Sequence, residues 1–143
     1  MSAPPELAGR SSCPLNAFLE MFGDRWSLLI VRDLLFGDLH EFGEFLSAKE
    51  RIATNVLADR LRRLESYGVV VKRAHPTDAR KSVYALSRKG ADLAPTLIEM
   101  TLWAAAHKNL EIPQPLRRRM TEEREAMLAD LRARVEASNA KAG

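Results

Sequence analysis

The 143-residue chain has a single cysteine, Cys13, which excludes an intramolecular disulfide and a zinc site built from several cysteines. Its apolar stretches, such as Leu28 to Val31, are far too short to span a bilayer. The first twelve residues, MSAPPELAGRSS, lack the apolar run of a secretory signal. We therefore expect a cytoplasmic protein that contacts no membrane. Glycine and proline number only seven each, which argues against a collagen-like or broadly disordered chain.

Motifs of the common enzyme classes are also missing. The sequence has no glycine-rich phosphate loop, no H-E-x-x-H, no G-x-S-x-G and no carboxylate pair in a plausible cleft, so we expect no catalytic residues. His40 and His75 lack acidic or cysteine partners at the spacing of metal ligands, so we expect neither a metal site nor a cofactor.

The net charge of the chain is only +3, but the charge is unevenly distributed. Residues 1–48 carry 3 basic and 7 acidic side chains, residues 49–90 carry 11 and 4, and residues 91–143 carry 8 of each. The middle third thus holds more than the whole excess of positive charge. Such a patch suits a polyanion such as nucleic acid, and the alternative is an ordinary solvated basic face.

Turn signals and hydrophobic periodicity divide the chain into helices and one hairpin. Helices are expected over residues 14–22, 25–36, 41–47, 54–66, 88–107 (bent at Pro95) and 115–137. Cys13, Asp24 and Ser87 are expected as caps at helix N-termini, and Thr54 stands at another helix N-terminus, where it could cap the helix, contact a phosphate or do both. The helix 25–36 is apolar around most of its circumference, which places it at the centre of the fold.

Between the fourth and fifth predicted helices the spacing of apolar residues changes from a helical pattern to a strand pattern. Val69–Val71 and Ser82–Leu86 are β-branched and aromatic runs, and the basic, turn-forming segment 75–81 separates them, which predicts a β-hairpin with a charged tip. This order of elements is that of a winged helix-turn-helix: mainly α with a small β-hairpin wing, and with extra N- and C-terminal helices. We expect a mobile arm over residues 1–12, the winged domain over 13–107 and a C-terminal helical extension over 108–143.

The second helix of the pair, residues 54–66, should lie in the major groove of double-stranded DNA. Its leucines at 57, 61 and 64 form one stripe, so the opposite face should meet the bases. Asn can bond adenine bidentately and Arg can bond guanine or phosphate, while the helix N-terminus favours phosphate. The arginines that flank this face and the cations of the hairpin complete the predicted DNA contacts: Arg51, Thr54, Asn55, Ala58, Asp59, Arg62, Arg63, Lys72, Arg73, Arg80 and Lys81. Asp78 is expected to hold the Arg80 guanidinium extended.

Several short motifs follow one another in order between residues 13 and 107. They include Cys13-Pro14, Arg25-Trp26, Ile52-Ala53-Thr54-Asn55-Val56-Leu57, Arg60-Leu61-Arg62-Arg63-Leu64-Glu65 and Tyr84-Ala85-Leu86-Ser87-Arg88-Lys89-Gly90. In these motifs the chain resembles the HxlR-type winged-helix transcriptional regulators, relatives of the MarR group. The resemblance implies a homodimer that binds a pseudo-palindromic operator and dimerises through the N-terminal helix and the helix after the wing. It does not extend to residues 108–143.

Cys13 stands where some members of this family sense oxidants or electrophiles. A thiol at a helix N-terminus is stabilised as the reactive thiolate. With one cysteine per chain, a protein disulfide would have to join two subunits, and otherwise the thiol would take a small-molecule cap. The alternative is a packed cysteine without a redox role.

Two further alternatives stay open. Trp26, Trp103 and His107 could line a pocket for a small-molecule effector, although aromatic residues at helical spacing usually belong to a core. The winged helix could also be a protein-interaction module with no specific DNA target, in which case the basic patch would be incidental.

Overall fold

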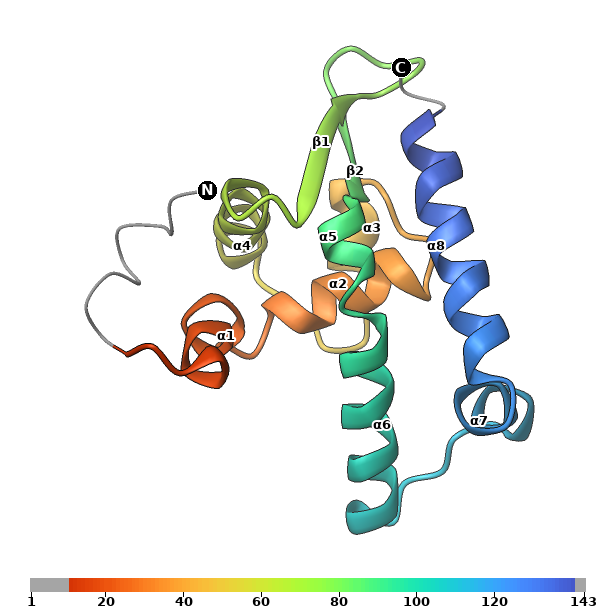
Figure 1. The fold of residues 1–143 in the computed structure, drawn as a ribbon. Helices are drawn as coiled ribbons and strands as arrows, with labels where there is room; N and C mark the ends of the chain where they lie inside the picture. Colours follow the sequence, from red (N-terminus) through yellow and green to blue (C-terminus); the bar gives the residue numbers. More distant parts are fainter. Residues whose placement is uncertain (1–10, 141–143) are drawn as a thin grey trace.

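The computed structural model describes residues 11–140, so the predicted N-terminal arm, residues 1–12, lies outside the described residues except for its last two. The chain is mainly helical with one antiparallel hairpin (Figure 1), which confirms the predicted fold class. Its elements in order are α1 (Pro14–Phe22), α2 (Ser27–Leu35), α3 (Phe42–Leu46), α4 (Thr54–Ser66), β1 (Val70–Ala74), β2 (Ser82–Leu86), α5 (Arg88–Ala91), α6 (Ala94–Lys108), α7 (Gln114–Thr121) and α8 (Arg124–Ala140). Among these described residues, no helix combines the length and apolarity that a membrane crossing requires.

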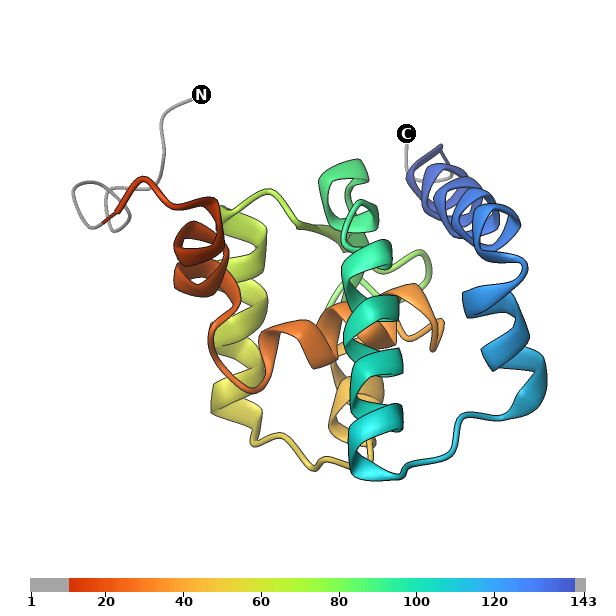
Figure 2. The same cartoon turned by 60° about the horizontal axis from the view of Figure 1, so that its bottom comes forward.

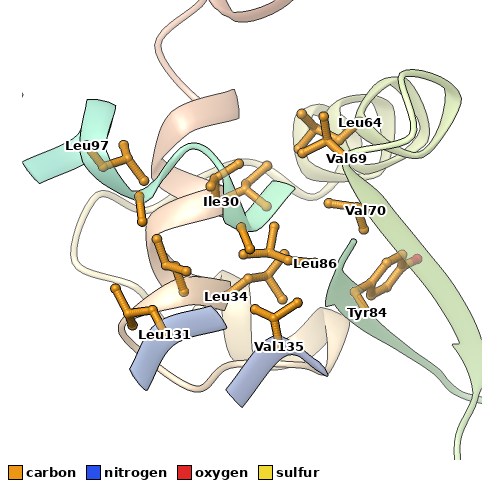
Figure 3. Close-up of a cluster of buried hydrophobic side chains, with 14 of the residues drawn as sticks. Ile30, Leu34, Leu64, Val69, Val70, Tyr84, Leu86, Leu97, Leu131 and Val135 are labelled. Atoms are coloured by element: carbon orange, nitrogen blue, oxygen red, sulfur yellow. The ribbon is translucent and has the colours of Figure 1, made fainter. Parts of the chain in front are cut away.

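Helix α2 lies at the centre of the fold, as its all-round apolar character predicts. It packs against α4, α6 and β2, and Val31 and Leu35 are fully buried. Figure 3 shows Ile30 and Leu34 of α2 among side chains from the wing strands and from α6 and α8. The helix begins at Ser27 instead of Arg25, with Trp26 as its N-cap residue. The Asp24 carboxylate accepts the N–H groups of Trp26 and Ser27 at 2.9 and 3.0 Å, so Asp24 caps the turn that leads into the helix.

The hairpin pairs Val70 with Leu86 and Ala74 with Ser82 in antiparallel register. Strand β1 thus extends beyond the predicted run Val69–Val71, to Ala74. The sharp turn between α4 and β1 is at Gly68, whose φ of 77° lies in the left-handed region that favours glycine. This confirms that the helix stops at Tyr67-Gly68.

The root of the wing is tightly packed. The Ser87 hydroxyl accepts the N–H of Gly90 at 3.1 Å, which confirms Ser87 as the cap of the helix that follows the wing. A Cβ at Gly90 would lie 2.4 Å from the carbonyl oxygen of Val69. Only glycine therefore fits where α5 crosses the start of the wing.

The predicted bent helix 88–107 is two helices, α5 and α6, separated by Asp92 and Leu93. The prediction of one helix was wrong because Pro95 does not interrupt a helix interior. It lies in the first turn of α6, where no backbone N–H is needed.

The C-terminal extension folds back on the body of the protein. The predicted helix 115–137 is split into α7 and α8, because the Arg118 carbonyl accepts the N–H groups of both Glu122 and Glu123 and ends the first helix. Met120 of α7 and Met127, Leu131 and Val135 of α8 are buried. In Figures 1 and 2, α8 runs alongside the hairpin on the side away from α4.

Candidate nucleic-acid interface

Helix α4 has the two faces that the leucine spacing predicts. Leu57, Leu61 and Leu64 are 0%, 2% and 0% exposed. On the opposite face Asn55 and Arg62 are exposed, whereas Ala58 and Asp59 are half-buried. The face therefore presents one amide and one guanidinium, together with the neighbouring exposed Arg63, as groups able to reach DNA.

The start of α4 differs in one detail from the prediction. Its N-cap is Ala53, with no side-chain cap, and Thr54 lies in the first turn as an exposed residue. Of the two roles considered for Thr54, capping of the helix is therefore not found. The first backbone N–H groups of a helix have no partner within it, so this uncapped end is suited to a phosphate.

The turn into α4 is anchored to α2 by an ion pair that the sequence analysis missed. Arg32 Nη1 and Nη2 donate to the two carboxylate oxygens of Glu50 at 3.0 and 2.8 Å. This bidentate contact lowers the pKa of Glu50 to about 2. The next residue, Arg51, has a φ of 58° and an exposed side chain. The Arg32–Glu50 pair therefore fixes the backbone from which Arg51 projects.

A second missed contact joins α4 itself to the start of α2. Arg60 Nε donates to Asp24 Oδ2 at 2.9 Å, and Arg60 also contacts Asp59. Burial alone would raise the pKa of Asp24, but hydrogen bonds from Ser27, Arg60 and the backbone outweigh it, and the pKa lies below its usual value. Asp59 is thus held by Arg60 within its own helix.

The wing carries three exposed cations, Lys72 on strand β1 and Arg80 and Lys81 at the tip. The Arg80 side chain is 91% exposed, and its Nε lies 3.3 Å from Asp78 Oδ1. The hydrogen bonds from Arg80 hold the pKa of Asp78 below its usual value. The expected Asp78–Arg80 contact is present in the structure.

Arg73 is placed differently from the other predicted wing cations. Its guanidinium donates to the Ser138 carbonyl at 3.0 Å and to Asn139 Oδ1 at 2.8 Å, both on α8. The side chain is half-buried. A direct DNA contact by Arg73 does not fit this placement, because its donors are engaged inside the protein.

Cys13 is exposed and is the N-cap residue of α1, directly before Pro14. Its N–H donates to Ser11 Oγ at 3.1 Å, and its carbonyl accepts the N–H of Ala17 at 3.0 Å. The thiol therefore does not have the surroundings of a packed core cysteine.

The three aromatic residues considered for an effector pocket do not share a cavity in the described chain. Trp26 lines a small cavity with Phe45 and Ile52, and the Arg25 guanidinium lies 5.2 Å from its ring centre. Trp103 is 64% exposed and stacks on His107 at 4.7 Å between ring centres. The Trp103–His107 pair lies on α6, away from the cavity beside Trp26.

Several large apolar side chains are exposed on α1, on α6 and just after α6. They are Leu15, Leu19, Met100, Trp103 and Leu110, each at least half exposed. Scattered apolar residues are common on surfaces, but such a set on two helices marks a surface suited to a protein partner.

His40, in the loop after α2, and His75, in the wing, each contact one carboxylate. His40 Nε2 lies 2.8 Å from Asp38 Oδ1, and His75 Nε2 lies 2.7 Å from Glu41 Oε1. Within residues 11–140 these pairs do not extend to a group of three potential metal ligands.

Comparison with known proteins places the chain in a class. The profile of the HxlR-like helix-turn-helix family matches residues 21–112. The HTH-type transcriptional regulator YodB of Bacillus subtilis (strain 168) is 32% identical over 97 residues, which cover 67% of this chain and 86% of YodB. The HTH-type regulator sll1512 of Synechocystis sp. is 31% identical over 88 residues, which cover 62% of this chain and 64% of that relative.

Solved structures agree with this placement. The structure of PA1607, described as a candidate transcription factor, has a TM-score of 0.62 at 38% identity, with 73% of this chain and 70% of that chain covered. The reduced form of YodB has a TM-score of 0.55 at 31% identity, with 66% and 93% covered, and YodB is also known in diamide-treated and quinone-bound forms.

Helix α4, the second helix of the α3–α4 pair, has an exposed face and is followed directly by the two-stranded wing. This is the arrangement of a winged helix-turn-helix transcriptional regulator. The family match extends over more than half of the sequence and includes α2 to α6. The chain belongs to the HxlR-like helix-turn-helix family.

Proposed function

We propose that the protein binds a pseudo-palindromic DNA operator as a homodimer, with α4 in the major groove and the wing on the adjacent backbone. The observation that carries this proposal is the set of exposed cations on α4 and the wing. Arg51, Arg62, Arg63, Lys72 and Lys81 form no side-chain ion pair with any residue of 11–140. Cations without acidic partners are free to replace the counterions of a phosphate backbone.

The exposed apolar residues of α1 and α6 support the homodimer. A second copy of the chain would cover them, and two copies related by a twofold axis would present two α4 helices to successive major-groove half-sites. Dimerisation would also double the number of phosphate contacts, which steepens the dependence of affinity on salt.

The proposal is tested by selecting bound fragments from genomic DNA and titrating the selected duplex at two salt concentrations. Enrichment of an inverted repeat, with affinity that falls steeply with salt, is expected. Folded protein that binds no DNA at low salt would instead support the protein-interaction alternative.

We further propose that oxidation of Cys13 changes operator binding. The thiol is exposed at the start of α1, and the relative YodB has been crystallised in reduced, diamide-treated and quinone-bound forms. With diamide, two Cys13 thiols from two protomers would join as a disulfide, and diamide would accept the two electrons and two protons to become the hydrazine. A tether or cap on α1 would shift the dimer interface and so the separation of the two α4 helices.

This second proposal is tested with wild type and Cys13→Ser, each with and without diamide, followed by dithiothreitol. Wild type should change its operator affinity reversibly, and the Ser variant should not respond. An equal response of both proteins would show that Cys13 is not the oxidised group.

A further inference from the structure

Two adjoining cavities, of about 440 and 640 Å³, lie between the wing and α8. They share the lining residues His40, Ala85 and Ser138 and so form one cleft, which we call the wing cleft. Each cavity falls within the size range of small-molecule pockets, about 300–1,000 Å³. Figure 3 shows Leu131 and Val135 of α8 beside Leu34 and Leu86, four of the residues that line the first cavity.

The wall that α8 contributes is outside the part of the chain that the family profile matches. That match ends at residue 112, whereas α8 spans Arg124–Ala140. The wing cleft therefore depends on the C-terminal extension of this chain. It is also separate from the cavity beside Trp26 and from the exposed Trp103–His107 pair.

The wing cleft combines an apolar floor with a few polar groups. Leucines and a valine from α2, β2 and α8 line the first cavity, together with Asp38, His40 and Arg134. His40 contacts the Tyr84 carbonyl through Nδ1 at 3.1 Å and Asp38 through Nε2 at 2.8 Å. Arg134 lies at a longer distance, 3.5 Å from Nη2 to the same Asp38 oxygen.

We propose that the wing cleft binds an amphipathic organic anion, a carboxylate with an apolar body of one or two rings. A guanidinium has five N–H donors in a planar fork that matches a carboxylate. In the part of the chain that the structure describes, the single ion pair of Arg134 is the long contact to Asp38. A ligand carboxylate binds this guanidinium in two-point fashion while Asp38 keeps its contact to His40. The leucines of the first cavity are at most 5% exposed, so the apolar body lies against Ala74, Pro76 and Val83 of the second cavity.

Occupation of the wing cleft is coupled to the wing through the last turn of α8. Ser138 lines both cavities, and its carbonyl accepts a hydrogen bond from Arg73 of β1. Asn139 accepts from Arg73 and donates to the Leu86 carbonyl at 3.3 Å. A ligand that displaces this turn releases or repositions β1. This coupling rests on the proposed function, whereas the binding site does not.

The site is tested by titrating the full chain with 1-naphthoate and, in parallel, with its uncharged amide, by isothermal calorimetry. Wild type should bind one naphthoate per chain, and the amide at least about tenfold more weakly, as expected for loss of a charge-assisted contact. Arg134→Gln should weaken naphthoate binding by a similar factor, and Ala137→Trp, which places an indole at the cleft, should abolish it. Arg132→Gln, on the same helix beside a different cavity, is the matched control and should bind as wild type does.

Absence of saturable naphthoate binding at millimolar concentration, or equal binding by all four proteins, would overturn the proposed site. Circular dichroism of each variant shows whether it is folded. Operator titrations without naphthoate test the proposed function independently. If naphthoate binds as expected but leaves operator affinity unchanged, the coupling to the wing is wrong and the site stands.

Discussion

The winged domain and the C-terminal extension are both rich in arginine, but they use it differently. On α4 and the wing most of the cations lie exposed without acidic partners. In the extension most arginines are paired: Arg118 with Glu122 and Glu123, Arg119 with Asp130, Arg124 with Glu99, and Arg134 with Asp38. The number of basic residues therefore does not by itself locate a DNA-binding surface. What matters is which cations the fold leaves available for phosphates, and these lie on α4 and the wing.

The largest difference in DNA affinity should separate charge reversal of an arginine on α4 from charge reversal of an arginine in the C-terminal extension. Arg62→Glu is expected to weaken binding to the selected operator at least about fivefold, because a contact worth roughly 1–3 kcal/mol is lost. Arg118→Glu changes the charge equally, but at an arginine that already pairs with Glu122 and Glu123 just after its helix, and it should leave the affinity nearly unchanged. Fluorescence anisotropy with labelled duplex measures both. Equal losses would mean that net charge alone controls binding.

The same comparison, between an available cation and an engaged one, can be made within one strand for the adjacent residues Lys72 and Arg73 of β1. Lys72→Ala should lower the magnitude of the salt slope of DNA binding by about 2, because one phosphate contact is removed from each protomer of the dimer. Arg73→Ala should leave the salt slope unchanged, and should increase amide hydrogen exchange in the last turn of α8, because Arg73 bonds Ser138 and Asn139. A reduced slope for Arg73→Ala would show that this guanidinium leaves α8 for DNA in the complex.

Arg80 represents an intermediate case, since it is exposed and yet paired with Asp78. Arg80→Ala should lower the magnitude of the salt slope of the dimer by less than about 2, because in each protomer the Asp78 carboxylate offsets part of the charge of Arg80. Thr77→Ala, in the same turn, is the control without a charge change. An unchanged slope for Arg80→Ala would remove the wing tip from the interface.

The smallest expected effect concerns stability in acid. The pKa of Glu50 is about 2 in the folded chain, below its ordinary value of 4.5, because of the hydrogen bond from Arg32. The pair therefore stabilises the fold above about pH 4.5, and this contribution is lost as the pH falls toward 2. Glu50→Gln should flatten the stability curve in this window by at most about 1 kcal/mol. Urea unfolding at a series of pH values measures this difference, with Glu125→Gln on α8 as the control.

Local signals predicted the fold because they act over a few residues. The leucine stripe at 57, 61 and 64 predicts the buried face of α4, and Gly68 and Ser87 predict where the neighbouring elements stop and start. The two helix breaks were missed for the same reason. Both Pro95 and the acidic pair after Thr121 are compatible with a continuing helix as well as with a new first turn, and tertiary packing decides between them.

The contacts that position the interface could not be predicted from local patterns. Arg32 and Glu50 are 18 residues apart, Arg60 and Asp24 are 36 apart, and Arg73 and Asn139 are 66 apart. No periodicity links such pairs, so sequence reasoning treated Arg73 as equivalent to Lys72. Its exposure likewise distinguishes Cys13 from a core cysteine. Local sequence patterns do not predict this exposure, because it depends on how α1 packs.

The wing is held at its base and along one side. Gly90 and Ser87 pack its base against α5, Arg73 binds its first strand to the last turn of α8, and His75 contacts Glu41. Arg80 and Lys81 are exposed beyond these contacts. A displacement of β1 away from α8 has to break the hydrogen bonds of Arg73 to Ser138 and Asn139. The compliance of the wing toward DNA is therefore set at two points, the packed base and the contact with α8.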